Sequence, residues 1–248
     1  MHETVQQWLT ELHNGTESPT NLYHTFLERL VHNFRISTIT KDGVPIYVCD
    51  RQVLDEFYQQ GVEILRYLCQ NRNEFFDYKN VELIGVEVPL EVPLRENLTF
   101  TAYLDIVTRS KITGQVKIYD LKTSTRGWNK WQKEDTKKTN QLLLYKHFYA
   151  QQHNISPDYI NIEFVILKRE TDNYTPRITR FQPDHTKLAI QRTLASFNEF
   201  INECFDEVGN YKVTDIKAVP SKNNCRFCQF NNNAALCSKS HYLERTSV

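Results

Sequence analysis

The segment Val116–Thr123 constrains the fold more than any other part of the chain, because it combines an apolar strand pattern with two charged side chains. Successive side chains of a β-strand point to opposite faces, so Asp120 and Lys122 share one face while Leu121 packs on the other. Turn-forming residues precede and follow the segment, as expected of a strand between turns. A carboxylate and an ammonium group in a core strand cost desolvation energy unless they serve each other or a metal ion.

A second carboxylate, Asp105, lies in the preceding strand-like segment, 100–107. The short loop Thr108–Gly114 predicts a hairpin between the two segments, which would bring Asp105 beside Asp120. Further along the chain, a helical pattern carries polar residues four positions apart, which therefore lie on one helix face. This pair is Gln141 and Tyr145.

Two neighbouring carboxylates and a lysine suit the hydrolysis of a phosphodiester. Mg²⁺ prefers hard oxygen ligands and completes its shell with water and substrate phosphate. Asp105 and Asp120 would supply two such ligands, and the Leu121 carbonyl would be a third. Lys122 would hold or help deprotonate the attacking water and stabilise developing negative charge. Glu87 would complete the site or a second metal position, with Glu91 as the competing choice.

These elements, in this order, resemble the PD-(D/E)xK nuclease superfamily, in its RecB-like branch, which includes many phage exonucleases. The matching residues are, in chain order, Glu87, Asp105, Asp120-x-Lys122 and Gln141-x-x-x-Tyr145. The resemblance covers about residues 80 to 150 well and a cysteine-bearing tail more loosely, and no clear upstream motif histidine is found. It implies a metal-dependent DNA exonuclease of recombination, repair or phage replication, using Mg²⁺ or Mn²⁺. In a supporting role, Gln141 and Tyr145 would bond phosphate oxygens or orient Lys122.

The pattern of helices and strands agrees with the α/β (α+β), restriction-endonuclease-like fold that the resemblance implies: a mixed central sheet flanked by helices. We expect a nuclease domain over residues 1–205 and a small cysteine-bearing appendage over residues 206–248. Apolar periodicity predicts helices, the third of them capped by Asp50, at 4–12, 22–34, 50–68, 139–152 and 185–205. The strands are expected at 44–49, 81–94, 99–107, 116–123 and 159–167.

The charge distribution points to DNA as the partner. The formal net charge is zero, so binding must come from local patches. Residues 108–148 carry ten Lys or Arg against three acids, which would surround the site with the positive charge that a phosphate backbone requires. No apolar run is long enough to span a bilayer, and the first residues do not form a signal peptide. We therefore expect a cytoplasmic protein of a bacterium or a phage-infected host.

Two tryptophans, Trp128 and Trp131, are interleaved with Arg126, Lys130 and Lys133 just beyond the expected site. Such a basic and aromatic stretch can stack unpaired bases at a DNA end. Tryptophans in this setting more often pack the loop that carries them, and packing is the interpretation we favour.

The tail carries a possible metal-binding set. Its residues are Cys225-x-x-Cys228, Cys237 and His241. A C-x₂-C pair with a third cysteine nearby is typical of metal sites in reducing compartments. Several RecB-like nucleases hold a [4Fe–4S] cluster with three such cysteines and one from far upstream, here Cys49 or Cys69. Alternatively, the local Cys₃His set would bind zinc, or the cysteines are free.

Three functional classes follow. The leading one is a DNA exonuclease, which would work with a recombination or replication protein and, because no G-x-x-x-x-G-K-[S/T] motif occurs, without a nucleotide cofactor. The second is an iron–sulfur single-strand nuclease of the CRISPR-associated type, acting with an integrase. The third is a non-catalytic DNA-binding protein on the same fold, against which the intact Asp105, Asp120 and Lys122 argue.

Overall fold

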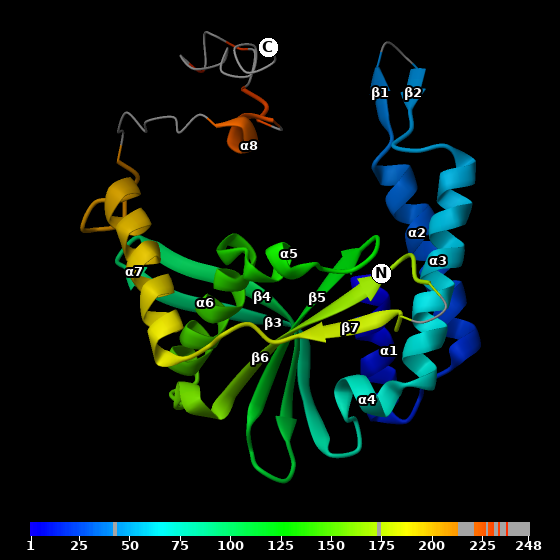
Figure 1. Cartoon of the computed structure of the whole chain (residues 1–248), viewed down its shortest axis with the longest axis horizontal. Coiled ribbons are helices and arrows are strands. Elements are labelled where there is room, and N and C mark those ends of the chain that lie inside the picture. Colours follow the sequence, from blue (N-terminus) through cyan, green and yellow to red (C-terminus); the bar gives the residue numbers. More distant parts are fainter. Residues whose placement is uncertain are drawn as a thin grey trace.

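A mixed β-sheet lies at the centre of the molecule and separates two groups of helices (Figure 1). The structure is a computed structural model that describes residues 1–41, 44–172, 175–212, 221–226 and 228–230, together with Asn233 and Cys237. Among these residues the central sheet has five strands. They are β3 (Val81–Arg95), β4 (Leu98–Ser110), β5 (Val116–Ser124), β6 (Ile160–Lys168) and β7 (Ile178–Phe181).

The strands lie side by side in chain order, with one parallel pair among antiparallel ones. β3 pairs antiparallel with β4, and β4 with β5, whereas β5 and β6 run parallel and β7 returns antiparallel to β6. Parallel neighbours need a crossover connection. The crossover between β5 and β6 consists of α5 (Lys130–Glu134), α6 (Thr136–Gln152) and the 3₁₀ turn Pro157–Tyr159. The restriction-endonuclease-like mixed sheet expected from the sequence is thereby confirmed.

The first face of the sheet is covered by the N-terminal helices (Figure 1). They are α1 (His2–Asn14), α2 (Pro19–Ile36), α3 (Arg51–Gln70) and α4 (Arg72–Phe76). Fully buried side chains such as Trp8, Leu65 and Phe76 pack there against Tyr119 and Leu121 of β5. Leu121 therefore lies on the face opposite Asp120, as the alternation along β5 predicts.

The second face is covered by α6 and α7 (Lys187–Cys204). Ile118 of β5 and Phe164 of β6 pack there against Leu142 and Phe148 of α6. The charged side chains Asp120 and Lys122 share this face with Ile118, so the candidate site lies where the second core ends.

Most expected elements are present within a few residues, including a helix cap at Asp50, whose Oδ1 accepts a hydrogen bond from Val53 N at 2.8 Å. The strand expected at 44–49 is the shorter β2 (Val44–Ile46), which pairs only with β1 (Ile39–Lys41) in a hairpin apart from the central sheet. Neither β1, α5 nor β7 was expected. The short helix α8 (Lys222–Cys225) lies in the tail.

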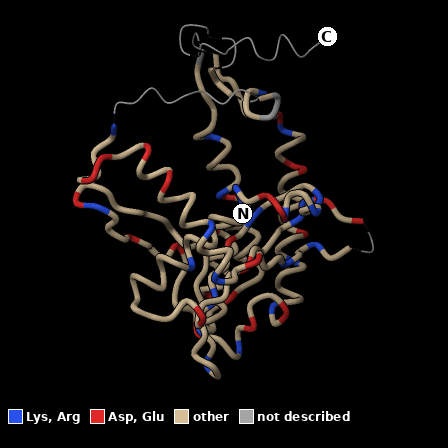
Figure 2. Tube along the Cα trace, turned by 60° about the vertical axis from the view of Figure 1, so that its left-hand side comes forward, with Lys and Arg blue, Asp and Glu red and all other residues tan. Residues whose placement is uncertain are grey.

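The segment after α7 remains attached to the sheet, since Asn97 N, in the β3–β4 turn, donates a hydrogen bond to Val208 O at 2.8 Å. The boundary between residues 205 and 206 stays a prediction. None of the described helices is long and apolar enough to cross a membrane. Charged residues of both signs are spread along the whole trace (Figure 2), which agrees with the zero formal net charge.

Candidate active site

The two aspartates lie where β4 and β5 separate. The hydrogen-bonded register of these strands runs from the pair Arg109–Val116 to the pair Ile106–Tyr119. Asp105 and Asp120 are the next residues beyond that last pair, one on each strand. The hairpin expected from the sequence therefore places both carboxylates at this point, which we call the β4–β5 fork.

The Asp105 side chain spans the fork. Its Oδ2 accepts a hydrogen bond from Leu121 N at 2.6 Å. The N–H and C=O groups of a strand residue point to the same side of the strand, so the Leu121 carbonyl is directed toward β4, as its N–H is. A carboxylate and a main-chain carbonyl are thus presented together at the fork.

Asp120 is almost fully buried, with 4% of its surface exposed. Its Oδ2 lies 2.6 Å from Lys122 Nζ, so the two side chains form a close ion pair. Burial raises the pKa of Asp120 to about 6, against the lowering effect of Lys122, and the nearby Asp105 raises it further. Burial also raises the pKa of Asp105.

A hydrogen-bonded chain connects Lys122 to α6. Lys122 Nζ donates to Gln141 Oε1 at 3.3 Å, and Gln141 Nε2 donates to the Tyr145 hydroxyl at 2.6 Å. Gln141 and Tyr145 lie four residues apart on one face of α6, as the sequence predicts, and this face is the one turned toward β5. The structure thus brings four of the expected site residues into one connected cluster.

Glu87 lies across from Asp105 on β3. The pairs Val86–Ile106 and Val88–Leu104 flank it in the register. Its φ of 47° falls in the left-handed region, which a non-glycine residue adopts at a cost of the order of 1–3 kcal/mol. Backbone strain of this kind clusters at functional sites.

The competing acid lies elsewhere. Glu91 pairs in the register with Thr101, four residues away from Asp105 along β4, and its main-chain N–H donates to Gln152 Oε1. Of the two acids considered from the sequence, only Glu87 is placed near the fork.

Two residues of α1 that the sequence did not single out also reach the site. Gln6 is buried, and its Nε2 donates to Glu87 Oε1 at 2.5 Å and to the Asp105 main-chain oxygen at 3.1 Å. His2 Nε2 lies 3.4 Å from Thr123 Oγ1. Burial, the α-amino group and Lys122 lower the pKa of His2 to about 4, so the ring is neutral at pH 7.

The sequence signal for these two residues is their i,i+4 spacing in a helix whose other buried positions are mostly apolar. That spacing puts His2 and Gln6 on one face of α1. The pattern alone does not separate Gln6 from the adjacent Gln7, which instead bonds Glu11.

The fork has the donor chemistry that a divalent cation requires. Two carboxylates lie together here with one ammonium group, Lys122, beside them, and the raised pKa values of both aspartates mean that a further positive charge would stabilise their ionised forms. Among the described residues, no three His, Cys, Asp or Glu side chains already form a metal site. A pair of carboxylates suits a hard cation such as Mg²⁺, because this ion takes few ligands from the protein and completes its shell with water and substrate phosphate.

The tail cysteines are placed only in part. Cys228 N donates to Cys225 O at 3.1 Å, which puts these two in one turn, and Cys237 N donates to Asn233 O at 2.9 Å. All six cysteines are within the described residues and are free thiols. His241 lies outside the described residues.

The two upstream cysteines differ in setting. Cys69 packs against the first core at the end of α3 that leads into α4, far from the β1–β2 hairpin (Figure 1). Burial raises the pKa of its thiol to about 11. Cys49 is half-buried and follows β2.

The two tryptophans beyond β5 are placed differently. Trp128 packs beside Phe164 and Phe181, with ring centroids 4.9 Å and 6.3 Å away, as the packing interpretation expects. Trp131, on α5, is 79% exposed, so for this residue that interpretation is wrong.

Comparison with known proteins agrees with this geometry. A family model described as the PD-(D/E)XK nuclease superfamily matches residues 1–233. No curated protein matches the sequence. Among solved structures, one titled "Crystal structure of SSO0001" aligns with a TM-score of 0.35 and 13% identity, covering 85% of this chain and 94% of that chain. At that level of similarity the alignment bears on neither mechanism nor substrate.

Proposed function

The chain belongs to the PD-(D/E)XK nuclease superfamily, and from that premise we propose that it is a metal-dependent DNA exonuclease whose active site is the β4–β5 fork. The observation that carries this proposal is the placement of Asp105, Asp120 and Lys122 together beyond the last pair of the β4–β5 register. Asp120 is buried there with Lys122 as its close cationic partner, and burial raises the pKa of its carboxyl to about 6, so a further positive charge at the fork would favour its ionised form.

In this proposal the carboxylates of Asp105 and Asp120 and the carbonyl of Leu121 hold Mg²⁺ or Mn²⁺, and Glu87 adds a further carboxylate from β3. A metal held by these residues would supply positive charge for the scissile phosphate and a more acidic water as the nucleophile. Asp105 is fixed by its bond to Leu121 N, and Glu87 by its bond from Gln6. The protein therefore holds its acidic groups in position before substrate binds.

Lys122 acts next to these carboxylates. Its ammonium group is partly exposed, 2.6 Å from Asp120 Oδ2 and 3.3 Å from Gln141 Oε1. From this position it can orient the attacking water and neutralise charge that develops on the phosphate. Tyr145 holds Gln141 through a 2.6 Å hydrogen bond, so α6 fixes the direction of the Lys122 side chain.

Exonuclease action in recombination, repair or phage replication, alone or with a recombination or replication protein, is the finer part of the proposal. It rests on the resemblance of the Glu87, Asp105, Asp120-x-Lys122 series to the RecB-like branch. A reducing cytoplasm, in a bacterium or a phage-infected host, is consistent with six free thiols. An iron–sulfur single-strand nuclease of the CRISPR-associated type is the alternative, and it would require a cluster in the tail.

For the tail we propose a metal held by Cys225, Cys228 and Cys237. The turn that joins Cys225 and Cys228 supports it, since two thiols of one turn can ligate a single ion. The fourth ligand would be His241 for zinc, or Cys49 or Cys69 for a [4Fe–4S] cluster. Burial raises the pKa of the Cys69 thiol to about 11, which opposes the ionisation that a metal ligand requires.

The proposed activity is tested with end-labelled linear duplex, linear single strands and covalently closed circular DNA, each with Mg²⁺ or with EDTA. We expect Mg²⁺-dependent degradation of linear substrates from their ends and intact closed circles. Rapid cutting of closed circles would replace the exonuclease assignment with an endonuclease. No cleavage of any substrate, by protein that binds Mg²⁺, would favour the non-catalytic DNA-binding class.

A further inference from the structure

Trp131 is an exposed aromatic side chain in the first helix after the strand that carries Asp120 and Lys122. It lies on the short helix α5, which follows β5 directly in the chain, and 79% of its surface is exposed. Its neighbours in this helix include Lys130 and Lys133. An indole ring exposed between two cations presents an open aromatic face on which a nucleobase can stack.

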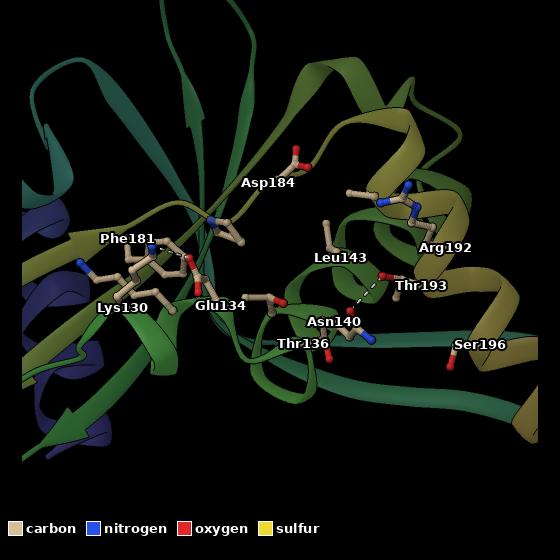
Figure 3. Close-up of a pocket in the computed structure, with 14 residues that line it drawn as sticks. Lys130, Glu134, Thr136, Asn140, Leu143, Phe181, Asp184, Arg192, Thr193 and Ser196 are labelled. Atoms are coloured by element: carbon tan, nitrogen blue, oxygen red, sulfur yellow. Dashed lines mark hydrogen bonds and ion pairs between the residues drawn. The ribbon is translucent and has the colours of Figure 1, made fainter.

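A cavity of about 880 Å³ lies next to α5, bounded by α6 and by the segment from β7 into α7 (Figure 3). Its apolar wall includes Leu143, Phe181 and Pro183. Its polar groups come from α5, α6 and α7 and carry both charges. The cationic ones are Lys130, Lys133 and Arg192, and the acidic ones are Glu134 and Asp184.

The acidic groups of this cavity are already engaged. Glu134 lies 3.8 Å from Lys130, its i,i+4 partner. Asp184 accepts hydrogen bonds from Thr186 N at 3.1 Å and from the Thr186 hydroxyl at 3.4 Å, at the start of α7. Neither Lys133 nor Arg192 forms an ion pair with any described residue. Lys133 instead lies over the Phe181 ring, 5.6 Å from its centroid. Two cations therefore remain for an anionic ligand.

The cavity and the candidate active site are on two sides of α6. Asn140 and Leu143 of this helix line the cavity, whereas Gln141 and Tyr145 belong to the hydrogen-bonded chain that ends at Lys122. A polymer that leaves the β4–β5 fork across the first turns of α6 would therefore meet α5, with Trp131, and the cavity.

We propose that Trp131 and this cavity form a subsite for an unpaired DNA strand, separated from the scissile phosphate by the first turns of α6. A base stacks on the Trp131 indole, and Lys133 and Arg192 bind backbone phosphates. Base stacking on an exposed ring requires a base that is not paired within a duplex, and such stacking tolerates any sequence. This inference rests on the proposed nuclease function, and it adds a preference for single-stranded ends or overhangs to it.

The test measures binding separately from cleavage. Fluorescein-labelled oligo(dT) and a blunt duplex are titrated, in EDTA, into a protein carrying Asp120→Asn, which prevents cutting. We expect Trp131→Ala to weaken oligo(dT) binding about tenfold and duplex binding little, and Trp131→Phe to retain most of the affinity. The matched control is Tyr159→Ala. It removes an exposed aromatic side chain just before β6, at the end of that strand away from Asp120 and Lys122.

Tryptophan fluorescence gives a second readout that a purely structural role would not produce. Of the three tryptophans, Trp8 is buried in the first core and Trp128 is partly buried against phenylalanines, so Trp131 is the most accessible to a base. We expect oligo(dT) to quench the emission, and Trp131→Phe to remove the quenching while binding persists.

The phosphate contacts are tested by the dependence of affinity on salt. We expect Lys133→Gln and Arg192→Gln each to reduce the slope of log K against log salt by about 0.7, the value for one phosphate contact on a single strand. Lys111→Gln, in the β4–β5 turn at the far end of the sheet, should leave the slope unchanged.

Unchanged oligo(dT) affinity and quenching in the Trp131 variants would overturn the inference, even if the wild-type protein cleaves DNA. If those variants also changed the sedimentation coefficient, Trp131 would be assigned to a protein contact instead. Conversely, Trp131-dependent oligo(dT) binding by a wild-type protein that never cleaves DNA would support this subsite while refuting the proposed activity.

Discussion

The Asp105 carboxylate accepts a 2.6 Å hydrogen bond from the Leu121 main-chain amide, across the point where β4 and β5 separate. This single contact joins the two strands beyond their last backbone pair and commits one carboxylate oxygen to the protein. It leaves the other oxygen for a cation. The position of the proposed metal ligand is thus set by the hairpin itself.

The first prediction concerns the central pair. Asp120→Asn and Lys122→Ala should each lower the rate of Mg²⁺-dependent cleavage by about 100- to 1000-fold, because each removes a charge aimed at the reacting phosphate or its metal. Initial rates on end-labelled linear DNA measure the effect, and circular dichroism checks the fold. The control, Glu82→Gln at the far end of β3, should retain normal rates. Near-normal rates in either site variant would remove these residues from the mechanism.

The second prediction concerns metal affinity. Asp105→Asn keeps an oxygen that can accept from Leu121 N but loses the negative charge, so Mg²⁺ binding should weaken by at least about tenfold while the fold persists. Glu87→Gln should weaken binding less, since Glu87 is exposed and bonded to Gln6. Isothermal titration with Mg²⁺ measures both. An unchanged titration for Asp105→Asn would mean that Glu87 or Glu91 holds the ion.

The third prediction follows from the pKa of Asp120, which burial raises from an ordinary 3.8 to about 6. Between these pH values the folded protein binds a proton that the unfolded chain has released. The free energy of unfolding contributed by Asp120 therefore falls as pH rises through this window, by about 3 kcal/mol in total.

Asp120→Asn removes this contribution. In EDTA the variant should be more stable than wild type at pH 8 and close to it at pH 4, as measured by urea unfolding. A stability difference that is the same at both pH values would show that the carboxylate is not destabilised by its burial.

The fourth prediction concerns Gln6 as a positioning residue. Gln6→Leu fills a similar volume but removes both donors, to Glu87 and to the Asp105 main-chain oxygen. We expect a several-fold loss of Mg²⁺ affinity and cleavage, with a change in unfolding free energy of about 1 kcal/mol. Gln6→Glu places a second carboxylate beside Glu87. The repulsion between them should reduce activity at pH 7 further than Gln6→Leu does. Full activity in Gln6→Leu would assign this glutamine to packing alone.

The fifth prediction concerns the tail. If Cys225, Cys228 and Cys237 bind a metal, its binding free energy also stabilises the folded tail, and Cys228→Ser should lower the melting temperature without changing Mg²⁺ binding. Elemental analysis of anaerobically purified protein distinguishes iron from zinc. Background levels of both elements would mean that the cysteines are free.

The fourth ligand of that site is identified by single substitutions. Loss of metal in His241→Ala would indicate a local zinc site. Loss in Cys49→Ser or Cys69→Ser would indicate an upstream ligand that joins the tail to the N-terminal region. With an upstream ligand, loss of the metal should lower the melting temperature more than with His241, because the metal bond then closes a long loop of the chain.

The sheet and the central residues were predictable because strong local patterns specify them. Strand alternation places Asp120 and Lys122 on one face, and a short turn places Asp105 across from Asp120. The strand β7 has only four residues and carries no pattern long enough to recognise. The helix α5 has a recognisable start, since Asn129 and Gln132 form a capping box, but at five residues it is shorter than a helical period analysis can detect.

The remaining site residues depend on packing between distant segments. Gln6 differs from Gln7 only in that α1 turns it toward the sheet, and the positive φ of Glu87 cannot be read from a run of strand-forming residues. Likewise, the sequence treats Trp128 and Trp131 alike, and only the fold decides that one packs on Phe164 while the other faces solvent.

The bond between Gln6 and Glu87 joins residues 81 positions apart, and that between Gln6 and Asp105 joins residues 99 apart. During synthesis, α1 therefore leaves the ribosome long before the strands that complete its contacts. Closing such long segments is slow compared with forming a helix, and Gln141 follows later still. A chain made only as far as β4 carries Glu87 and Asp105 but lacks the α6 residues that hold Lys122 in place. The proposed site is thus complete only after Tyr145 has been translated and α6 has packed on the sheet.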